Sequence, residues 1–133
     1  MFLDTAYAVA LSCDTDRFHN AALELAVELQ SAGIRLVTTR AVVLEIGNSL
    51  SRQRYRRKAA ILLQSIENDE TVDIIPMSED LYREALDLFC QRPDKEWGLI
   101  DCVSYLVMTQ RGISEALTTD DHFRQMGFKA LLR

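Results

Sequence analysis

The hydrophobic positions of this chain alternate between short continuous runs and longer stretches with helical spacing. Residues 16–32 place Ala22, Leu25, Ala26 and Leu29 on one face, which predicts an amphipathic helix ending before Gly33. Short apolar runs without that spacing predict buried strands. The expected strands are 1–5, 34–38, 72–75, 116–119 and 128–132, and the expected helices are 16–32, 41–52, 54–67, 78–91, 99–111 and 121–126.

The alternation of strands and helices predicts an α/β fold with a mostly parallel sheet that helices cover on both faces. The 133 residues fit one domain, 1–133, and a hydrophobic content of 48% is enough for a core. Ligands of such folds bind beyond the carboxyl ends of the strands. The search for functional residues therefore begins at those ends.

The net charge of −5 argues against a protein that binds nucleic acid through its whole surface. Nucleic-acid binding would need a local basic patch or bound cations. One such patch exists, and its five members are Arg52, Arg54, Arg56, Arg57 and Lys58, around Tyr55. The patch can bind phosphates, or it can be the solvated face of a helix.

The cysteines and the hydropathy pattern indicate a soluble cytoplasmic protein. Cys13, Cys90 and Cys102 are odd in number and widely spaced, which predicts buried free thiols in a reducing compartment. We find no signal peptide pattern and no apolar run of about 18 residues that would span a membrane.

Two acids stand where expected strands end. Asp4 follows the first strand and Asp120 follows the fourth. Each can be a ligand at the edge of the sheet, or simply the N-cap of the following helix.

Two further acids interrupt apolar sequence. Glu45 lies in the run 42–46, with Asn48 one turn later, and a buried carboxylate is costly unless it is paired or bound to a cation. The alternative is a solvated helix edge. Asp101 follows Leu99 and Ile100, where it can serve a site or merely stabilise the first turn of a helix.

Together the four acids predict a divalent metal site. Carboxylates that converge on one cleft repel each other, and hard cations such as Mg²⁺ or Mn²⁺ relieve that repulsion. Such cations activate water and stabilise the leaving oxygen in phosphodiester cleavage.

Four segments resemble the motifs of the PIN-domain nucleases, and most closely the VapC-type toxins. They are Phe2-Leu3-Asp4-Thr5, Val43-Leu44-Glu45-Ile46-Gly47-Asn48, Trp97-Gly98-Leu99-Ile100-Asp101-Cys102-Val103-Ser104, and Leu117-Thr118-Thr119-Asp120-Asp121-His122-Phe123 followed by Gly127-Phe128. Their order and separation are typical of the family, and the resemblance spans nearly the whole chain.

The resemblance implies a three-layer α/β/α fold and Mg²⁺- or Mn²⁺-dependent cleavage of RNA to 5′-phosphate and 3′-hydroxyl ends. It also implies a homodimer and a role as the toxin of a type II toxin–antitoxin pair, with an antitoxin protein as partner. The expected catalytic and metal-binding residues are Asp4, Glu45, Asp101 and Asp120, and the expected supporting residues are Thr5, Asn48, Ser104 and Thr119. The chain departs from the family pattern at Ile100, where Thr or Ser is common, and at Asp121, which adds an acid.

Two alternatives stay open. A PIN-like fold can serve as a catalytically silent binding or regulatory protein. A receiver-type signalling domain would need paired acids after the first strand and a Lys ending the last strand, whereas Lys129 opens it. We expect a structural role for His122, and for Trp97 a hydrophobic anchor in preference to a base-stacking platform.

Overall fold

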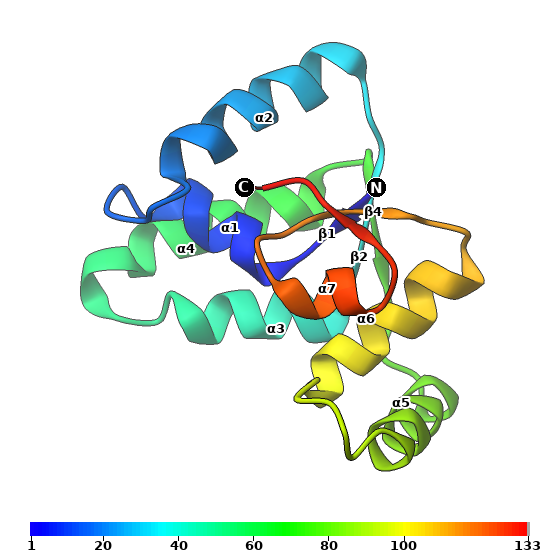
Figure 1. Cartoon of the computed structure of the whole chain (residues 1–133). Coiled ribbons are helices and arrows are strands. Elements are labelled where there is room, and N and C mark those ends of the chain that lie inside the picture. Colours follow the sequence, from blue (N-terminus) through cyan, green and yellow to red (C-terminus); the bar gives the residue numbers. More distant parts are fainter. Residues whose placement is uncertain (133) are drawn as a thin grey trace.

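A computed structural model of the protein describes residues 1–132, with a five-stranded sheet at its centre (Figure 1). The strands are β1 (Phe2–Leu3), β2 (Leu36–Thr39), β3 (Val72–Ile75), β4 (Glu115–Leu117) and β5 (Lys129–Ala130). Their order is β3-β2-β1-β4-β5, and each neighbouring pair is parallel. The predicted parallel α/β sheet is confirmed.

Seven helices connect these strands among the described residues. They are α1 (Thr5–Ser12), α2 (His19–Ala32), α3 (Arg40–Ser49), α4 (Gln53–Asn68), α5 (Glu79–Gln91), α6 (Leu99–Gln110) and α7 (Asp121–Gln125). Figure 1 shows α1, α2 and α4 on one side of the strands and α5 and α6 on the other. This arrangement gives the three layers of an α/β/α sandwich, as right-handed crossovers require.

The chain changes its winding direction between β1 and β4. From β1 it winds outward through β2 to β3, and then crosses back to β4 and β5 on the other side of β1. Phe2 pairs with Ala116 and Leu3 with Leu117, so β1 and β4 end together. This is a topological switch point, where adjacent loops diverge and leave room for a ligand.

The predicted elements agree with the structure except at the first helix. The strand Val72–Ile75 has the predicted bounds, Ser78 caps α5 by accepting a hydrogen bond from Leu81 N (3.1 Å), and Gly33 ends α2 with φ of +64°. Most other predicted elements shift by one to three residues at an end.

Helix α1 was not predicted. Apolar and small residues occur around its whole circumference, because it packs against α2, α3 and α4 as well as covering the sheet. A helix buried on most sides lacks the polar stripe that makes helical spacing visible in a sequence. The predicted helix 16–32 begins at His19 instead, after a turn in which Asp16 Oδ1 accepts a hydrogen bond from Phe18 N (2.8 Å).

The cysteine prediction is right at two positions and wrong at the third. Cys13 and Cys102 are buried, whereas Cys90 is exposed, because it lies on the solvent-facing side of α5. Within residues 1–132, no helix is both long enough and apolar enough to cross a membrane.

Candidate active site

Asp4 and Asp120 lie close together beyond the paired ends of β1 and β4, and Thr118 connects them. The Thr118 hydroxyl donates a hydrogen bond to Asp4 Oδ2 (2.7 Å) and accepts one from the backbone N–H of Asp120 (3.0 Å). Thr118 is fully buried, so its hydroxyl has no competing water. These bonds fix both acids relative to the two central strands.

Asp4 is the most enclosed of the four predicted acids, with 5% of its surface exposed. Burial raises the pKa of its carboxyl to about 6, against the lowering effect of the hydrogen bonds from Thr118 and Thr5. The negative charges of Asp101 and Glu45 raise that pKa further. The charges of Asp101 and Glu45 are therefore close enough to interact with the Asp4 carboxylate.

Glu45 reaches the same region from α3. Its Oε1 accepts a hydrogen bond from the hydroxyl of Thr5, the residue that follows Asp4 and opens α1. Glu45 is partly buried, and its neighbours Val42, Val43 and Ile46 pack into the core. Glu45 is therefore held next to the start of α1, beside Asp4.

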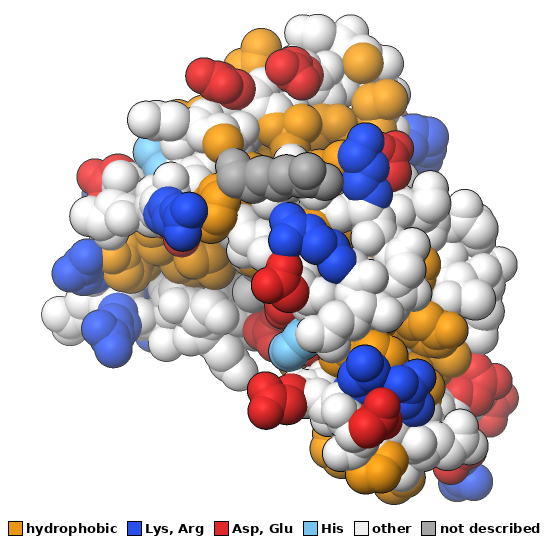
Figure 2. Space-filling model, in the orientation of Figure 1, with side chains coloured by type: hydrophobic (Ala, Val, Ile, Leu, Met, Phe, Trp, Pro, Cys, Tyr) orange, Lys and Arg blue, Asp and Glu red, His pale blue; other side chains and the backbone are white. Residues whose placement is uncertain are grey.

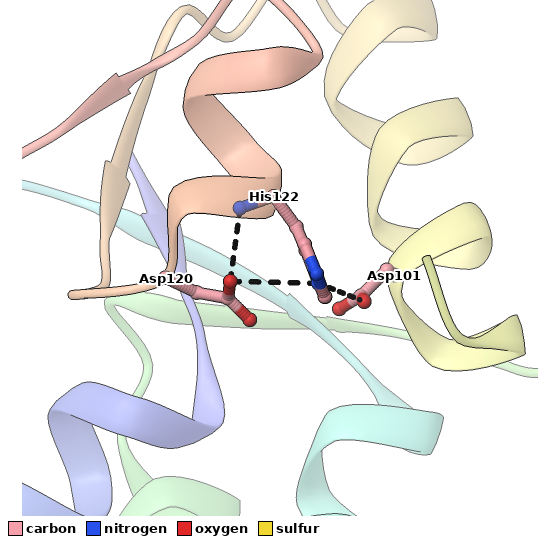
Figure 3. Close-up of side chains that lie close together, drawn as sticks. All are labelled: Asp101, Asp120 and His122. Carbon is pink, nitrogen blue, oxygen red and sulfur yellow. Dashed lines mark hydrogen bonds and ion pairs between the residues drawn. The ribbon is translucent and has the colours of Figure 1, made fainter. Parts of the chain in front are cut away.

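Asp101 approaches from the first turn of α6 (Figure 3). Its Oδ2 accepts a hydrogen bond from Gly98 N (3.1 Å), which closes the start of the helix, and lies 3.1 Å from His122 Nδ1. His122 also contacts Asp120: its backbone N–H donates to Asp120 Oδ1 (2.9 Å), and its Nδ1 lies 3.5 Å from the same oxygen. The imidazole thus stands between the two acids.

Contacts through Thr5, Thr118 and His122 connect the four acids, although they come from four separate parts of the chain. Asp101, Asp120 and His122 each place one potential ligand atom within 4.8 Å of the others, a group that does not include Asp4 or Glu45. Glu45, Asp101 and Asp120 each use one carboxylate oxygen for the hydrogen bonds described above. Among residues 1–132 no side chain donates a hydrogen bond to Asp101 Oδ1, Asp120 Oδ2 or Glu45 Oε2. A set of oriented carboxylates with oxygens to spare fits a hard divalent cation.

The family comparison agrees with this geometry. The model of the PIN domain family matches residues 1–129. The chain belongs to the PIN domain family. Membership of this family excludes the alternative that the chain is a receiver-type signalling domain.

Relatives of this PIN domain include a toxin of known structure. The chain is 27% identical over 128 residues to the 23S rRNA-specific endonuclease VapC20 of Mycobacterium tuberculosis, covering 96% of this chain and 95% of that protein. The crystal structure of Mycobacterium tuberculosis VapC20, described as a Sarcin-Ricin loop cleaving toxin, matches with a TM-score of 0.82. The sequence identity in that match is 26%, over 96% of this chain and 95% of the other.

The predicted supporting residues of this PIN domain have different surroundings. Thr5 contacts Glu45, as described above. Ser104 is buried, but its hydroxyl donates to the Ile100 carbonyl of its own helix (3.0 Å). Asn48 is exposed and Thr119 is partly buried. The roles of these residues stay predictions.

Two polar residues at the site were not predicted to act there. Thr118 was read as part of a strand, although a threonine two residues before an acid is a common local hydrogen-bond donor or acceptor. His122 was assigned a general structural role, and its ring is now seen between two of the acids. In the sequence, Thr118 lies two residues before Asp120 and His122 lies two residues after it. This spacing is the feature that could have indicated their positions at the site.

Trp97 has the predicted anchoring position at the entry to α6. Its ring is buried and stacks on Tyr105 with centroids 6.4 Å apart, and its Nε1 donates to Gln125 Oε1 (3.1 Å). Arg92 and Lys95 also lie over the ring. A nucleic-acid base has no free face to stack on there.

The basic segment 52–58 differs from most other cationic positions of this PIN domain. Arg52, Arg54, Arg56, Arg57 and Lys58 are exposed at the start of α4, and none of them forms an ion pair with the described acids. Elsewhere arginine and lysine pair with acids at Arg40–Glu67, Arg92–Asp94, Arg111–Asp73, Arg124–Asp121 and Lys129–Glu115. Figure 2 shows acidic side chains and a histidine at the centre of one face, with basic side chains around them.

A cavity between helices lies away from the acids. It is an apolar groove of about 380 Å³ between α1, α2 and α4, and its lining includes Tyr7, Leu11, Leu29 and Leu62. None of the four site acids lines it. The functional assignment therefore rests on the converging carboxylates and not on cavity size.

Proposed function

We propose that this protein is a metal-dependent endoribonuclease that hydrolyses RNA phosphodiester bonds. The observation that carries the proposal is the close cluster of Asp101, Asp120 and His122, to which Thr118 links Asp4. Glu45 is held next to Asp4 by the Thr5 hydroxyl. In the proposal these four residues bind Mg²⁺ or Mn²⁺ and are the catalytic residues. Membership of the PIN domain family and the likeness to VapC20 support the same activity.

The bound cation supplies water activation and stabilisation of the leaving oxygen. The residues of the chain supply position. Thr118 donates a hydrogen bond to Asp4, and Thr5 donates one to Glu45. The backbone N–H of Gly98 orients Asp101. Burial disfavours the ionised form of the Asp4 carboxyl. A cation bound at that carboxylate would therefore stabilise its ionised form.

RNA binding is assigned in this proposal to the basic segment 52–58. An acidic protein needs a local cationic surface to approach a polyanion. These five exposed cations form no ion pair with the acids of residues 1–132. Each phosphate contact should contribute to affinity in a salt-dependent way.

The proposed biological role is that of the toxin of a type II toxin–antitoxin pair. The support is the toxin description of VapC20, which matches this chain over nearly its whole length. An antitoxin protein and a homodimeric state are part of the proposal. Co-purification with the product of a neighbouring gene and the mass of the purified protein in solution test the two statements separately.

The proposal is tested by incubating the purified protein with structured and single-stranded RNAs, including a sarcin–ricin stem-loop. Reactions contain Mn²⁺, Mg²⁺ or EDTA, and product ends are mapped. The expected effect of each of four variants is a fall in cleavage rate of about 10³-fold or more while the protein stays folded. The variants are Asp4→Asn, Glu45→Gln, Asp101→Asn and Asp120→Asn.

Asp121→Asn is the matched control. Asp121 is adjacent to Asp120, but its side chain is 74% exposed and pairs with Arg124, so cleavage should persist. Loss of activity in Asp121→Asn together with full activity in Asp120→Asn would reverse the assignment of the fourth acid. A well-folded wild-type protein that cleaves no RNA in any metal would favour the silent binding protein.

A further inference from the structure

The imidazole of His122 lies between two of the site acids. Its side chain lies at the start of α7, a short helix of five residues that Asp120 caps. The Nδ1 atom is 3.1 Å from Asp101 Oδ2 and 3.5 Å from Asp120 Oδ1 (Figure 3). One ring nitrogen therefore faces oxygens from two elements that are not otherwise joined by a side-chain hydrogen bond in residues 1–132.

The proton on the ring follows from the chemistry of its neighbours. Carboxylate oxygens only accept hydrogen bonds when they are ionised, so the nitrogen that faces them must carry hydrogen. Nδ1–H is then the donor, and Asp101 Oδ2 is the nearer acceptor. The donor does not reach Asp101 Oδ1 or Asp120 Oδ2, which stay available for a cation.

We infer that His122 is a positioning residue that holds Asp101 and Asp120 at a fixed separation through its Nδ1–H. The inference rests on the proposed function, because it concerns the same carboxylates. The donor orients one oxygen of each acid and so directs the other oxygen of each acid toward the metal. Residues that hydrogen-bond to metal-ligating carboxylates in this way typically change metal affinity about 10- to 100-fold when they are replaced.

Two amide substitutions separate this role from its rivals. In His122→Asn the side-chain amide N–H can occupy the place of Nδ1, whereas in His122→Gln it falls nearer the place of Nε2. His122→Ala removes both. His19→Asn is the matched control, because His19 Nδ1 is hydrogen-bonded to the Ala10 carbonyl (2.7 Å) and to none of the site acids within residues 1–132.

The measurement is Mn²⁺ binding to the RNA-free protein by titration calorimetry, with the thermal unfolding of each variant in EDTA as the check of folding. We expect His122→Ala and His122→Gln to weaken Mn²⁺ binding about 10- to 100-fold. His122→Asn should stay within about threefold of wild type, because it restores the donor. His19→Asn should match wild type.

Three results would overturn the inference. Equal Mn²⁺ affinity in wild type and all His122 variants would show that the bridge is irrelevant, and the proposed nuclease function would be untouched. Retained affinity in Gln with loss in Asn would make Nε2 a direct ligand instead. A wild-type protein that binds no Mn²⁺ would overturn the inference and the metal dependence together.

Discussion

The acid site and the apolar groove are two regions that share helix α1 but are built differently. The first turn of α1 carries Thr5 next to Asp4, whereas Tyr7, Ala8 and Leu11 of the same helix line the groove. In the acid site one oxygen of each carboxylate has a named hydrogen-bond donor. The groove is formed mostly by apolar side chains.

The difference shows that the two regions are held together by different kinds of interaction. Directional hydrogen bonds fix atoms well enough to hold a cation, whereas apolar packing fixes only shape and contributes to stability according to buried area. Substitutions in the acid site should therefore change chemistry strongly, and substitutions in the groove should change mainly stability. The following predictions go from the largest expected effect to the smallest.

Glu45→Gln tests the charge of the acid site without removing its hydrogen bond. The amide oxygen can still accept from the Thr5 hydroxyl, so the fold should be unchanged, while the cation loses one negative ligand. Because electrostatic stabilisation by a metal is worth several kcal/mol, cleavage should fall about 10³-fold. Single-turnover rates at saturating Mn²⁺ measure this.

Thr5→Val is the converse variant for Glu45. It keeps the charge and removes the hydroxyl, so a smaller loss of rate is expected than in Glu45→Gln. An equal loss in both would mean that orientation, and not charge, determines what Glu45 does.

The pH dependence of stability tests the cost of buried Asp4 without metal. Burial raises the Asp4 pKa from 3.8 to about 6 in the folded protein, so the folded state binds this proton more tightly than the unfolded state. Stability from this group is full below about pH 4 and is lost as pH rises through about 6, amounting to about 2 to 3 kcal/mol. Urea unfolding in EDTA measures it.

Asp4→Asn isolates this effect from other acids. Asp69 and Asp94 have lowered pKa values because of hydrogen bonds from Thr71 and Arg92, and they act in the opposite direction as pH falls. The stability of Asp4→Asn minus that of wild type should grow from near zero at pH 4 to its full value at pH 7. Added Mn²⁺ should shrink the difference, and a difference independent of pH would contradict the raised pKa.

Thr118→Val removes the hydroxyl that links β1 and β4 while nearly conserving volume. The change leaves Asp4 Oδ2 and Asp120 N without their buried partner, which should destabilise the protein by about 1 to 3 kcal/mol. The Asp4 pKa should rise further, since the Thr118 hydrogen bond lowers it. Urea unfolding at pH 5 and pH 7 measures both effects.

Thr118→Ser is the matched control for this variant, because it keeps the hydroxyl. If it proves as unstable as Thr118→Val, the methyl group and not the hydrogen bond would be the important feature.

Leu62→Ala should have the smallest effect and tests the groove. Leu62 is partly buried in its lining, so its truncation should cost about 1 to 2 kcal/mol, below the range for a fully buried leucine. The RNA cleavage rate and Mn²⁺ affinity should be unchanged. A tenfold fall in cleavage rate by a protein that stays folded would show that the two regions are coupled through α1.

Much of the fold could be predicted from the sequence, because strand and helix signals lie in local patterns. The positions of Asp4 and Asp120 after apolar runs were enough to place them at one sheet edge. The buried helix Thr5–Ser12 escaped because it lacks a polar face, which is a property of its neighbours and not of its own residues.

The contacts inside the site could not be predicted in the same way. The sequence shows that Thr118 and His122 flank Asp120, but not that one hydroxyl reaches Asp4 or that the ring turns toward Asp101. Those contacts depend on the register of β1 against β4 and on where α6 begins. They are fixed by tertiary packing between segments far apart in the chain.

The hydrogen bond between Thr118 and Asp4 joins residues separated by 114 positions, and this separation has a consequence for the timing of assembly. β1 lies at the centre of the sheet, yet one of its two partners, β4, is synthesised long after it. Contacts between residues so far apart in the sequence form late, because the chain between them must first close into a loop. In a growing polypeptide that has not yet paired β4 with β1, Asp4 has no hydrogen bond from Thr118, and Asp120 is not held beside Asp4. The two acids are therefore brought together only after β4 has been synthesised and has joined the sheet.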